Sequence, residues 1–284
     1  MQPQRSKPVA GRKVAIVTGG TFGIGKAISL TLSRRGYHVV AFGLEGRQIS
    51  SVAERAIPVL NEEAAAEGLD IELMEADVSV ASDVAKIVQH SINKYGRIDA
   101  LVNNAAIGPL GTVLDTDEET WDRIVSVNLK GVFLCTKAVL PSMIAQGGGS
   151  IVIVGSGAGW GKPNMAAYAA SKGGLFALAA SLGYDHFHDH IRVNTVIPGG
   201  GGIVSGMSLG RVDGDVSRLG RDAPGTVAGR VATGEDLASA VAFLLSDDAA
   251  AISGTIIDVG CFAHQGGPIP RRQPKADVSS SKGV

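Results

Sequence analysis

Near the start of this chain of 284 residues lies the stretch Val14-Ala15-Ile16-Val17-Thr18-Gly19-Gly20-Thr21-Phe22-Gly23-Ile24-Gly25. Its first four residues form a short apolar run, which is typical of a strand buried on both faces of a parallel sheet. After the glycines come apolar residues at helical spacing and a terminating glycine: Ile24, Ala27, Ile28, Leu32 and Gly36. A strand, a glycine turn and a helix in succession predict a phosphate-binding unit, because the free N–H groups and the dipole of the helix attract negative charge. A tight turn that needs glycine only for its backbone angles is the alternative.

The same alternation of strands and helices continues along the chain. Strand-like runs are expected at residues 14–17, 38–42, 71–76, 98–103, 150–155, 191–197 and 255–259. Helical patterns between them cover about 49–67, 83–95 and 121–146, and one more helix follows a capping-box-like stretch at 233–236. The chain is therefore expected to be an α/β protein, with a doubly wound, seven-stranded parallel sheet, helices on both faces and a Rossmann-like, single domain.

Residues 12–263 form the body of the chain, because no shift in composition divides them. Residues 1–11 are polar and basic with two prolines, and residues 264–284 are rich in proline, serine, glycine and basic residues. Both segments are expected to be disordered tails. The stretch at about 199–229 is glycine-rich and charged without clear periodicity, which indicates a mobile lid.

The overall composition excludes several classes of partner. The formal net charge is −1, so no electrostatic attraction to nucleic acid or to an anionic membrane is expected. No apolar run is expected to approach the roughly 20 residues of a membrane span. Cys135 and Cys261 lie far apart and lack metal-ligand spacing, so no disulfide is expected. We therefore expect the protein to be located in the reducing cytoplasm.

The motif Tyr168-Ala169-Ala170-Ser171-Lys172 places a phenol and an amine four residues apart, on one face of an expected helix. A phenol has an ordinary pKa of about 10. A catalytic tyrosine therefore needs an adjacent cation that favours its phenolate, and Lys172 is placed to be that cation. Aromatic and basic residues also meet at this spacing on many surface helices, so the pair needs support from other motifs.

That support comes from further motifs and their order along the chain: residues 18–25, Asp77-Val78, Asn103-Asn104-Ala105-Ala106, Ser126-Val127-Asn128, Ser156, Tyr168 to Lys172 and Val193 to Gly199. By these motifs the chain resembles the short-chain dehydrogenase/reductase family, one-domain subgroup, over roughly residues 12–263.

The resemblance implies an oxidoreductase that interconverts a secondary alcohol and a ketone by hydride transfer. Tyr168 would be the general acid and base, and Lys172 would lower the pKa of Tyr168 and hold the nicotinamide ribose. Ser156 would orient the substrate oxygen, and Asn128 would hold a water of a proton relay. For Ser156 a role in the turn alone, and for Asn128 a local helix contact, are the alternatives from the residues themselves.

The resemblance also implies a cofactor site. The expected cofactor-binding residues are Gly19, Thr21, Phe22, Gly23, Ile24, Gly43, Glu45, Arg47, Asp77, Val78, Asn104, Ala105, Ala106, Tyr168, Lys172, Pro198 and Gly199. The choice between NAD and NADP stays open. Gly43 stands where many relatives have an aspartate for the adenosine ribose, whereas Glu45 could bind that ribose in NAD and Arg47 could bind the 2′-phosphate of NADP. Ala106 replaces a usual glycine, and a slight shift near the nicotinamide ribose is expected.

We hypothesise that the substrate binds in a mainly apolar pocket under the lid. Such a pocket favours aliphatic or cyclic substrates. Its candidate residues are Ile107, Pro109, Trp160, Met207 and Leu209, although the segment between Ser156 and Tyr168 is one residue shorter than usual, which puts the path of Trp160 in doubt. By resemblance, the helix that begins near Tyr168 pairs between subunits, so a homotetramer is expected.

Two other functions and one metal site are alternatives to this prediction. A non-redox lyase or epimerase uses the same scaffold, and a non-catalytic nucleotide sensor keeps the glycine motif but usually loses the catalytic residues. His186 and His190 are four residues apart, as zinc ligands on a helix are. They fall where a helix ends before a strand, so a solvated helix terminus is the preferred interpretation and no metal is expected.

Overall fold

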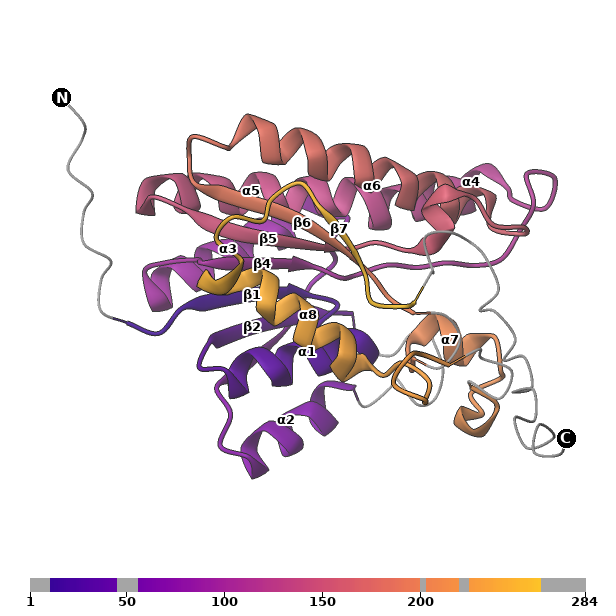
Figure 1. Ribbon diagram of the computed structural model, residues 1–284, viewed down its shortest axis with the longest axis horizontal. Helices are drawn as coiled ribbons and strands as arrows, with labels where there is room; N and C mark the ends of the chain where they lie inside the picture. Colours follow the sequence, from indigo (N-terminus) through magenta and orange to yellow (C-terminus); the bar gives the residue numbers. More distant parts are fainter. Residues whose placement is uncertain (1–10, 45–55, 200–202, 220–224, 262–284) are drawn as a thin grey trace, which may run out of the picture.

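In the computed structural model, the residues described are 11–44, 56–199, 203–219 and 225–261. They form a parallel sheet of seven strands in the order β3-β2-β1-β4-β5-β6-β7 (Figure 1). The strands are β1 Val14–Thr18, β2 His38–Gly43, β3 Ile71–Glu75, β4 Ala100–Asn103, β5 Gly149–Val154, β6 Ile191–Ile197 and β7 Ile256–Asp258. The predicted fold, a Rossmann-like single domain, is confirmed. The predicted tails fall outside the described residues, except for Gly11.

Helices cover both faces of the sheet (Figure 1). In β1, Ala15 and Val17 point to a core shared with α1 and α8, while Ile16 points to a second core shared with α3, α5 and α6. Alternate residues of a strand face opposite sides, so a strand between two helical layers is apolar throughout. The helices are α1 Gly23–Arg34, α2 Ala56–Ala66, α3 Ala81–Tyr95, α4 Glu118–Val125, α5 Gly131–Gln146, α6 Ala166–Asp185, α7 Gly206–Gly210 and α8 Gly234–Leu245.

The long helix expected at 121–146 is one helical stretch, but it is not uniform. It begins at Glu118 and contains a π segment, Ser126–Lys130, between α4 and α5. A π turn carries an extra residue and occurs frequently at functional sites. Residues 118–146 are long and apolar enough to cross a membrane by length and composition. Here, however, α5 packs one face against the sheet and α3, as the core helix of an α/β domain does.

The start of β4 differs from the sequence prediction. β4 begins at Ala100 instead of Ile98, because the backbone N–H and C=O of Ile98 bond to the side chain of Gln146 at 3.3 and 2.7 Å. The start predicted for the second helix, near residue 49, lies outside the described residues. The capping box of α8 is present: Asp236 accepts hydrogen bonds from the Thr233 N–H at 2.8 Å and from its hydroxyl at 3.2 Å.

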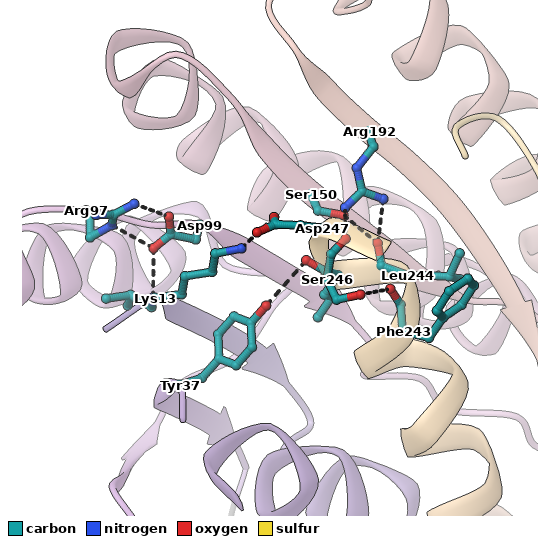
Figure 2. A network of polar contacts seen from close by, with 12 residues as sticks. Lys13, Tyr37, Arg97, Asp99, Ser150, Arg192, Phe243, Leu244, Ser246 and Asp247 are labelled. Atoms are coloured by element: carbon teal, nitrogen blue, oxygen red, sulfur yellow. Dashed lines mark hydrogen bonds and ion pairs between the residues drawn. The ribbon is translucent and has the colours of Figure 1, made fainter. Parts of the chain in front are cut away.

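The C-terminal end of α8 is held by side chains from the amino ends of the strands (Figure 2). Arg192 of β6 donates to the carbonyls of Leu244 and Ser246 at 2.5 and 3.0 Å. The Tyr37 hydroxyl donates to Leu245 O at 3.3 Å. The last carbonyls of a helix have no partner within it. Leu244 O also accepts from the Ser150 hydroxyl at 3.1 Å and Ser246 O from the Ala249 N–H at 3.3 Å, so Arg192 and Tyr37 complete a shared set of bonds at this terminus.

Replacing Arg192 with methionine should lower the free energy of unfolding by about 1–3 kcal/mol, because two charge-assisted hydrogen bonds in a half-buried site are lost. Chemical denaturation measures this change. The matched control is Arg218→Met, since Arg218 forms an exposed ion pair with Asp213, and such pairs contribute less than about 1 kcal/mol. Equal effects of both substitutions would show that the α8 terminus does not depend on Arg192.

Candidate active site

The sheet order reverses between β1 and β4, and the carboxyl ends of these two strands form the ligand-binding crevice of open α/β sheets. The glycine turn follows β1 at this point. Phe22, the N-cap of α1, forms no side-chain cap, and the first turn of α1 contains no acidic residue. Its N–H groups are therefore open to an external anion, which fits the pyrophosphate of a dinucleotide.

Asn104 ties the end of β4 to the glycine turn. Its side-chain amide donates to the carbonyls of Thr18 and Gly19, both at 3.0 Å. The hydroxyl of Thr18 accepts from the N–H groups of Asn104 and Ala105 at 2.9 and 3.0 Å. Both amide donors of Asn104 are thus used by the protein, so it shapes the cofactor site instead of offering an N–H to it. Thr18 was not among the predicted site residues, although its place between strand and glycines was visible in the sequence.

Most other predicted cofactor residues lie along the same edge. Gly43 ends β2 beside the glycine turn, since a Cβ on it would stand 3.1 Å from the Thr21 hydroxyl. Asp77 and Val78 follow β3, and the Asp77 carboxylate accepts from the N–H and hydroxyl of Ser79 at 2.8 and 2.7 Å. The remaining described members of the set lie at the start of α1 or in the turns after β1, β4 and β6: Gly23 and Ile24 begin α1, and the turns hold Phe22, Ala106, Pro198 and Gly199. Glu45 and Arg47 lie outside the described residues.

Tyr168 and Lys172 lie on α6, as predicted from their spacing, and both are buried, with 7% and 3% of their surface exposed. Lys172 Nζ lies 5.9 Å from the centre of the Tyr168 ring. Burial raises the pKa of the Tyr168 phenol, against a side-chain hydrogen bond with Ser156 and the charge of Arg211, which lower it. Burial is the largest of these effects on the Tyr168 pKa, and the lowering by Lys172 expected from the sequence stays a prediction.

Lys172 is itself affected by burial, which lowers the pKa of its amine to about 8. Its Nζ donates to the carbonyl of Val154 at 2.8 Å, the one acceptor it has among the described residues. A charged amine has three N–H donors, so two of them remain for other acceptors. Ribose hydroxyls supply such acceptors, and this donor set fits the nicotinamide ribose.

Asn128 lies in the π segment and is fully buried. Its side-chain carbonyl accepts from the Ile107 N–H at 2.9 Å, and its amide donates to Ile107 O at 2.8 Å and to the Ser171 hydroxyl at 3.0 Å. Ser171, missed in the sequence analysis, in turn donates to Tyr168 O at 2.7 Å. Both amide donors are thus occupied, and one lone pair of Oδ1 remains for the predicted water. The alternative of a contact with its own helix backbone is wrong, because its partners come from distant segments.

Ser156 serves the local turn and also faces the catalytic tyrosine. It is the N-cap of the short 3₁₀ helix Gly157–Trp160, and its hydroxyl accepts from the Ala158 N–H at 3.2 Å. The side-chain hydrogen bond with Tyr168 places the same hydroxyl beside the phenol. The role of Ser156 in the turn is therefore present in the structure, and the orientation of a substrate oxygen by its hydroxyl stays a prediction.

The predicted pocket residues are only partly brought together. A Cβ on Gly108 would stand 2.6 Å from Met207 Sδ and 3.0 Å from Tyr168 Cδ2, so Met207 and Tyr168 both border Gly108. Leu209 is fully buried, whereas Pro109 is exposed. Trp160 stacks on Phe176 of α6 with ring centres 4.3 Å apart, and about half of its surface is exposed. Of the predicted lid, residues 203–219 and 225–229 are described, and they include α7 and the short helix Val216–Arg218.

Replacing Gly108 with alanine should reduce kcat by about tenfold or more, because the added methyl group overlaps Met207 Sδ and the Tyr168 ring. Steady-state kinetics measures this effect. Adding Met207→Ala should restore part of the lost rate by making room for the methyl group. A Gly108→Ala enzyme with wild-type kcat would show that this close approach does not matter for catalysis.

The histidines at the end of α6 bind neighbouring groups. His186 follows the helix directly, and its Nδ1 lies 2.8 Å from an Asp189 carboxylate oxygen. Among the described residues, no group of three or more histidine, cysteine or acidic side chains is arranged to hold a metal ion.

Comparison with known proteins agrees with this geometry. A family model for short chain dehydrogenases matches residues 13–208. Dehydrogenase/reductase SDR family member 4 of Sus scrofa is 37% identical over 259 residues, covering 90% of this chain and 88% of the relative. The 2-(S)-hydroxypropyl-CoM dehydrogenase 3 of Xanthobacter autotrophicus is 37% identical over 266 residues, covering 90% and 96%. A solved structure of an actinorhodin polyketide ketoreductase variant with NADPH has a TM-score of 0.77 at 28% identity, covering 89% and 97%.

These matches extend over nearly the whole described domain. They support an oxidoreductase, while the relatives' names differ in substrate. On this evidence the chain belongs to the short-chain dehydrogenase/reductase family.

Proposed function

We propose that this protein is an NAD(P)-dependent alcohol dehydrogenase or ketone reductase that interconverts a secondary alcohol and a ketone. The observation that carries the proposal is that Ser156 and Lys172 lie around the buried Tyr168, at the same sheet edge as the glycine turn. A bound nicotinamide supplies or accepts the hydride. The task of the protein is then to position the substrate and to move one proton.

Tyr168 moves that proton, giving it to the substrate oxygen in reduction and taking it in oxidation. The Ser156 hydroxyl donates a hydrogen bond to the same oxygen and stabilises the charge that develops there. Lys172, when protonated, favours the phenolate of Tyr168 and holds ribose hydroxyls with its two remaining donors. Asn128 supports the relay by fixing Ile107 and Ser171, and its free Oδ1 lone pair is the position for a water.

Whether the enzyme uses NAD or NADP is open, and one experiment tests both the cofactor and the proposed reaction. No carboxylate stands at Gly43, which leaves room for a 2′-phosphate, and one solved neighbour is named with NADPH. Titration with NADH and NADPH, followed by a screen of secondary alcohols for absorbance of the reduced nicotinamide, decides both questions. Absence of an absorbance change with every alcohol and ketone would favour a non-redox reaction or a nucleotide sensor.

We further propose that the enzyme is a cytoplasmic homotetramer. An apolar groove of about 230 Å³ lies on the outer side of α5 and α6 and is lined mainly by Phe133, Leu140, Pro141, Ile144, Leu178 and Leu182. Phe133 and Ile144 expose 47% and 43% of their surface there. A second copy of the chain would cover these side chains. Light scattering of the purified protein tests this proposal, and a monomeric mass would contradict it.

A further inference from the structure

The short helix α7 holds a fixed position beside the catalytic tyrosine. Its N-cap Ser205 accepts from the Ser208 N–H at 3.1 Å, and the Ser205 N–H donates to the Ser208 hydroxyl at 2.8 Å. The Leu209 side chain is fully buried, which anchors the helix to the body of the domain. As a result, Met207 is held beside Gly108, where the Tyr168 ring also lies: a Cβ on Gly108 would stand 2.6 Å from Met207 Sδ and 3.0 Å from Tyr168 Cδ2.

Arg211 continues this helical turn. Its backbone angles, φ −80° and ψ −14°, are those of a right-handed helix, so the direction of the side chain follows the helical pattern. Residues four apart share one helical face, and Met207 and Arg211 have this spacing. Arg211 therefore arises on the face that meets Tyr168, about one 5.4 Å turn beyond Met207. The lowering of the Tyr168 pKa by the Arg211 charge agrees with this placement.

The charge of Arg211 has no partner among the residues that the structure describes. The neighbouring basic side chains of this segment are paired: Arg218 with Asp213 at 3.2 Å and Arg230 with Asp236 at 2.6 Å. Arg211 is exposed, and its side chain forms no hydrogen bond or ion pair within the described ranges. A planar guanidinium with five donors binds carboxylate, sulfonate and phosphate groups with two parallel hydrogen bonds.

We propose that Arg211 is the anion-binding residue of the substrate site, and that the substrates are short hydroxy acids and oxo acids. The acid group binds Arg211, the reacting carbon lies at Tyr168 and Ser156, and Met207 covers the apolar carbons between them. This inference rests on the proposed function and names its substrate class. It also changes the hypothesis of a mainly apolar substrate pocket: only the part of the pocket near Met207 is then apolar, and the part near Arg211 binds an anion.

The test compares an acid with its neutral ester. The ratio of kcat/KM for 3-hydroxybutanoate to kcat/KM for its methyl ester is measured for the full-length wild type, Arg211→Met, Arg211→Lys and the control Arg218→Met. Arg211→Met should lower kcat/KM for the acid about 10- to 100-fold, mainly through KM, and leave the ester within about twofold. Arg211→Lys should restore part of the loss, and Arg218→Met should resemble the wild type. Sulfonate and phosphate analogues of equal length show which anion fits best.

Each result decides between distinct explanations. Equal losses for acid and ester, or weaker NADH and NADPH binding in a fluorescence titration of Arg211→Met, would overturn the anion site and indicate a role in structure or in cofactor binding. An unchanged ratio in Arg211→Met would also overturn it, while activity on the ester would keep the proposed oxidoreductase intact. A wild-type enzyme that is inactive on acids, esters and ketones with either cofactor would overturn both proposals.

Discussion

Replacing Tyr168 with phenylalanine should abolish measurable turnover while leaving cofactor binding largely intact. The substitution removes only the hydroxyl that transfers the proton, and a general acid or base contributes about 10²- to 10⁴-fold to the rate. The phenyl ring keeps its buried position beside Met207, so the shape of the site is retained. Nicotinamide absorbance measures turnover, and fluorescence titration with NADH or NADPH measures cofactor binding.

The same helix offers a matched control for this experiment. Tyr184 also lies on α6, but it exposes 84% of its surface and has no place in the site. Tyr184→Phe should therefore keep wild-type kcat and cofactor affinity. If Tyr168→Phe retained turnover comparable to Tyr184→Phe, the proton would come from another group and the proposed mechanism would be wrong.

Replacing Gly25 with alanine should destroy cofactor binding and destabilise the domain by about 3 kcal/mol or more. A Cβ at this position would stand 1.9 Å from Gly19 O and 2.6 Å from Asn104 Nδ2, so the glycine turn and the first turn of α1 would have to separate. Overpacking of rigid backbone typically costs about 1–3 kcal/mol, and here it also breaks the bonds of Asn104. Thermal unfolding and cofactor titration measure the two effects.

Gly183→Ala is the control for the general effect of adding a methyl group to a helical glycine. Its nearest neighbour, the Ser253 hydroxyl oxygen, would be 3.4 Å from the new Cβ, an ordinary contact. Alanine is favoured over glycine in a helix by about 0.5–1 kcal/mol, so this variant should be neutral or slightly more stable. Normal cofactor binding by Gly25→Ala would show that the close approach seen at the turn is not needed for the site.

The seven strands of the parallel sheet could be predicted because their signals are local. Buried parallel strands are apolar throughout, helices repeat their apolar residues at helical spacing, and glycines separate the two. These local rules gave the wrong start for β4, because a side chain distant in the sequence takes the hydrogen bonds that a neighbouring strand would otherwise form. Gln146 takes the hydrogen bonds of Ile98 and shortens β4, and no property of residues 98–103 announces this contact.

The candidate site divides in the same way. The motifs identified Ser156, Tyr168 and Lys172, because residue type and spacing are what a motif records. Their state depends on partners that lie far apart in the chain. The carbonyl of Val154, in another element, accepts a hydrogen bond from Lys172. Asn128, for which a bound water was expected, forms hydrogen bonds with Ile107 and Ser171.

Residue order alone was sufficient for the fold class and the family, and it singled out Tyr168 and Lys172 as the proposed proton-transferring pair, since these follow from local periodicity and from motifs. The tertiary structure was needed for the direction of the pKa shifts at Tyr168 and Lys172, which burial sets. It was also needed to find Arg211 near Tyr168, 43 positions apart in the numbering. Burial and distant charges arise only when separate segments pack together, and for this reason only the folded chain could indicate a substrate class.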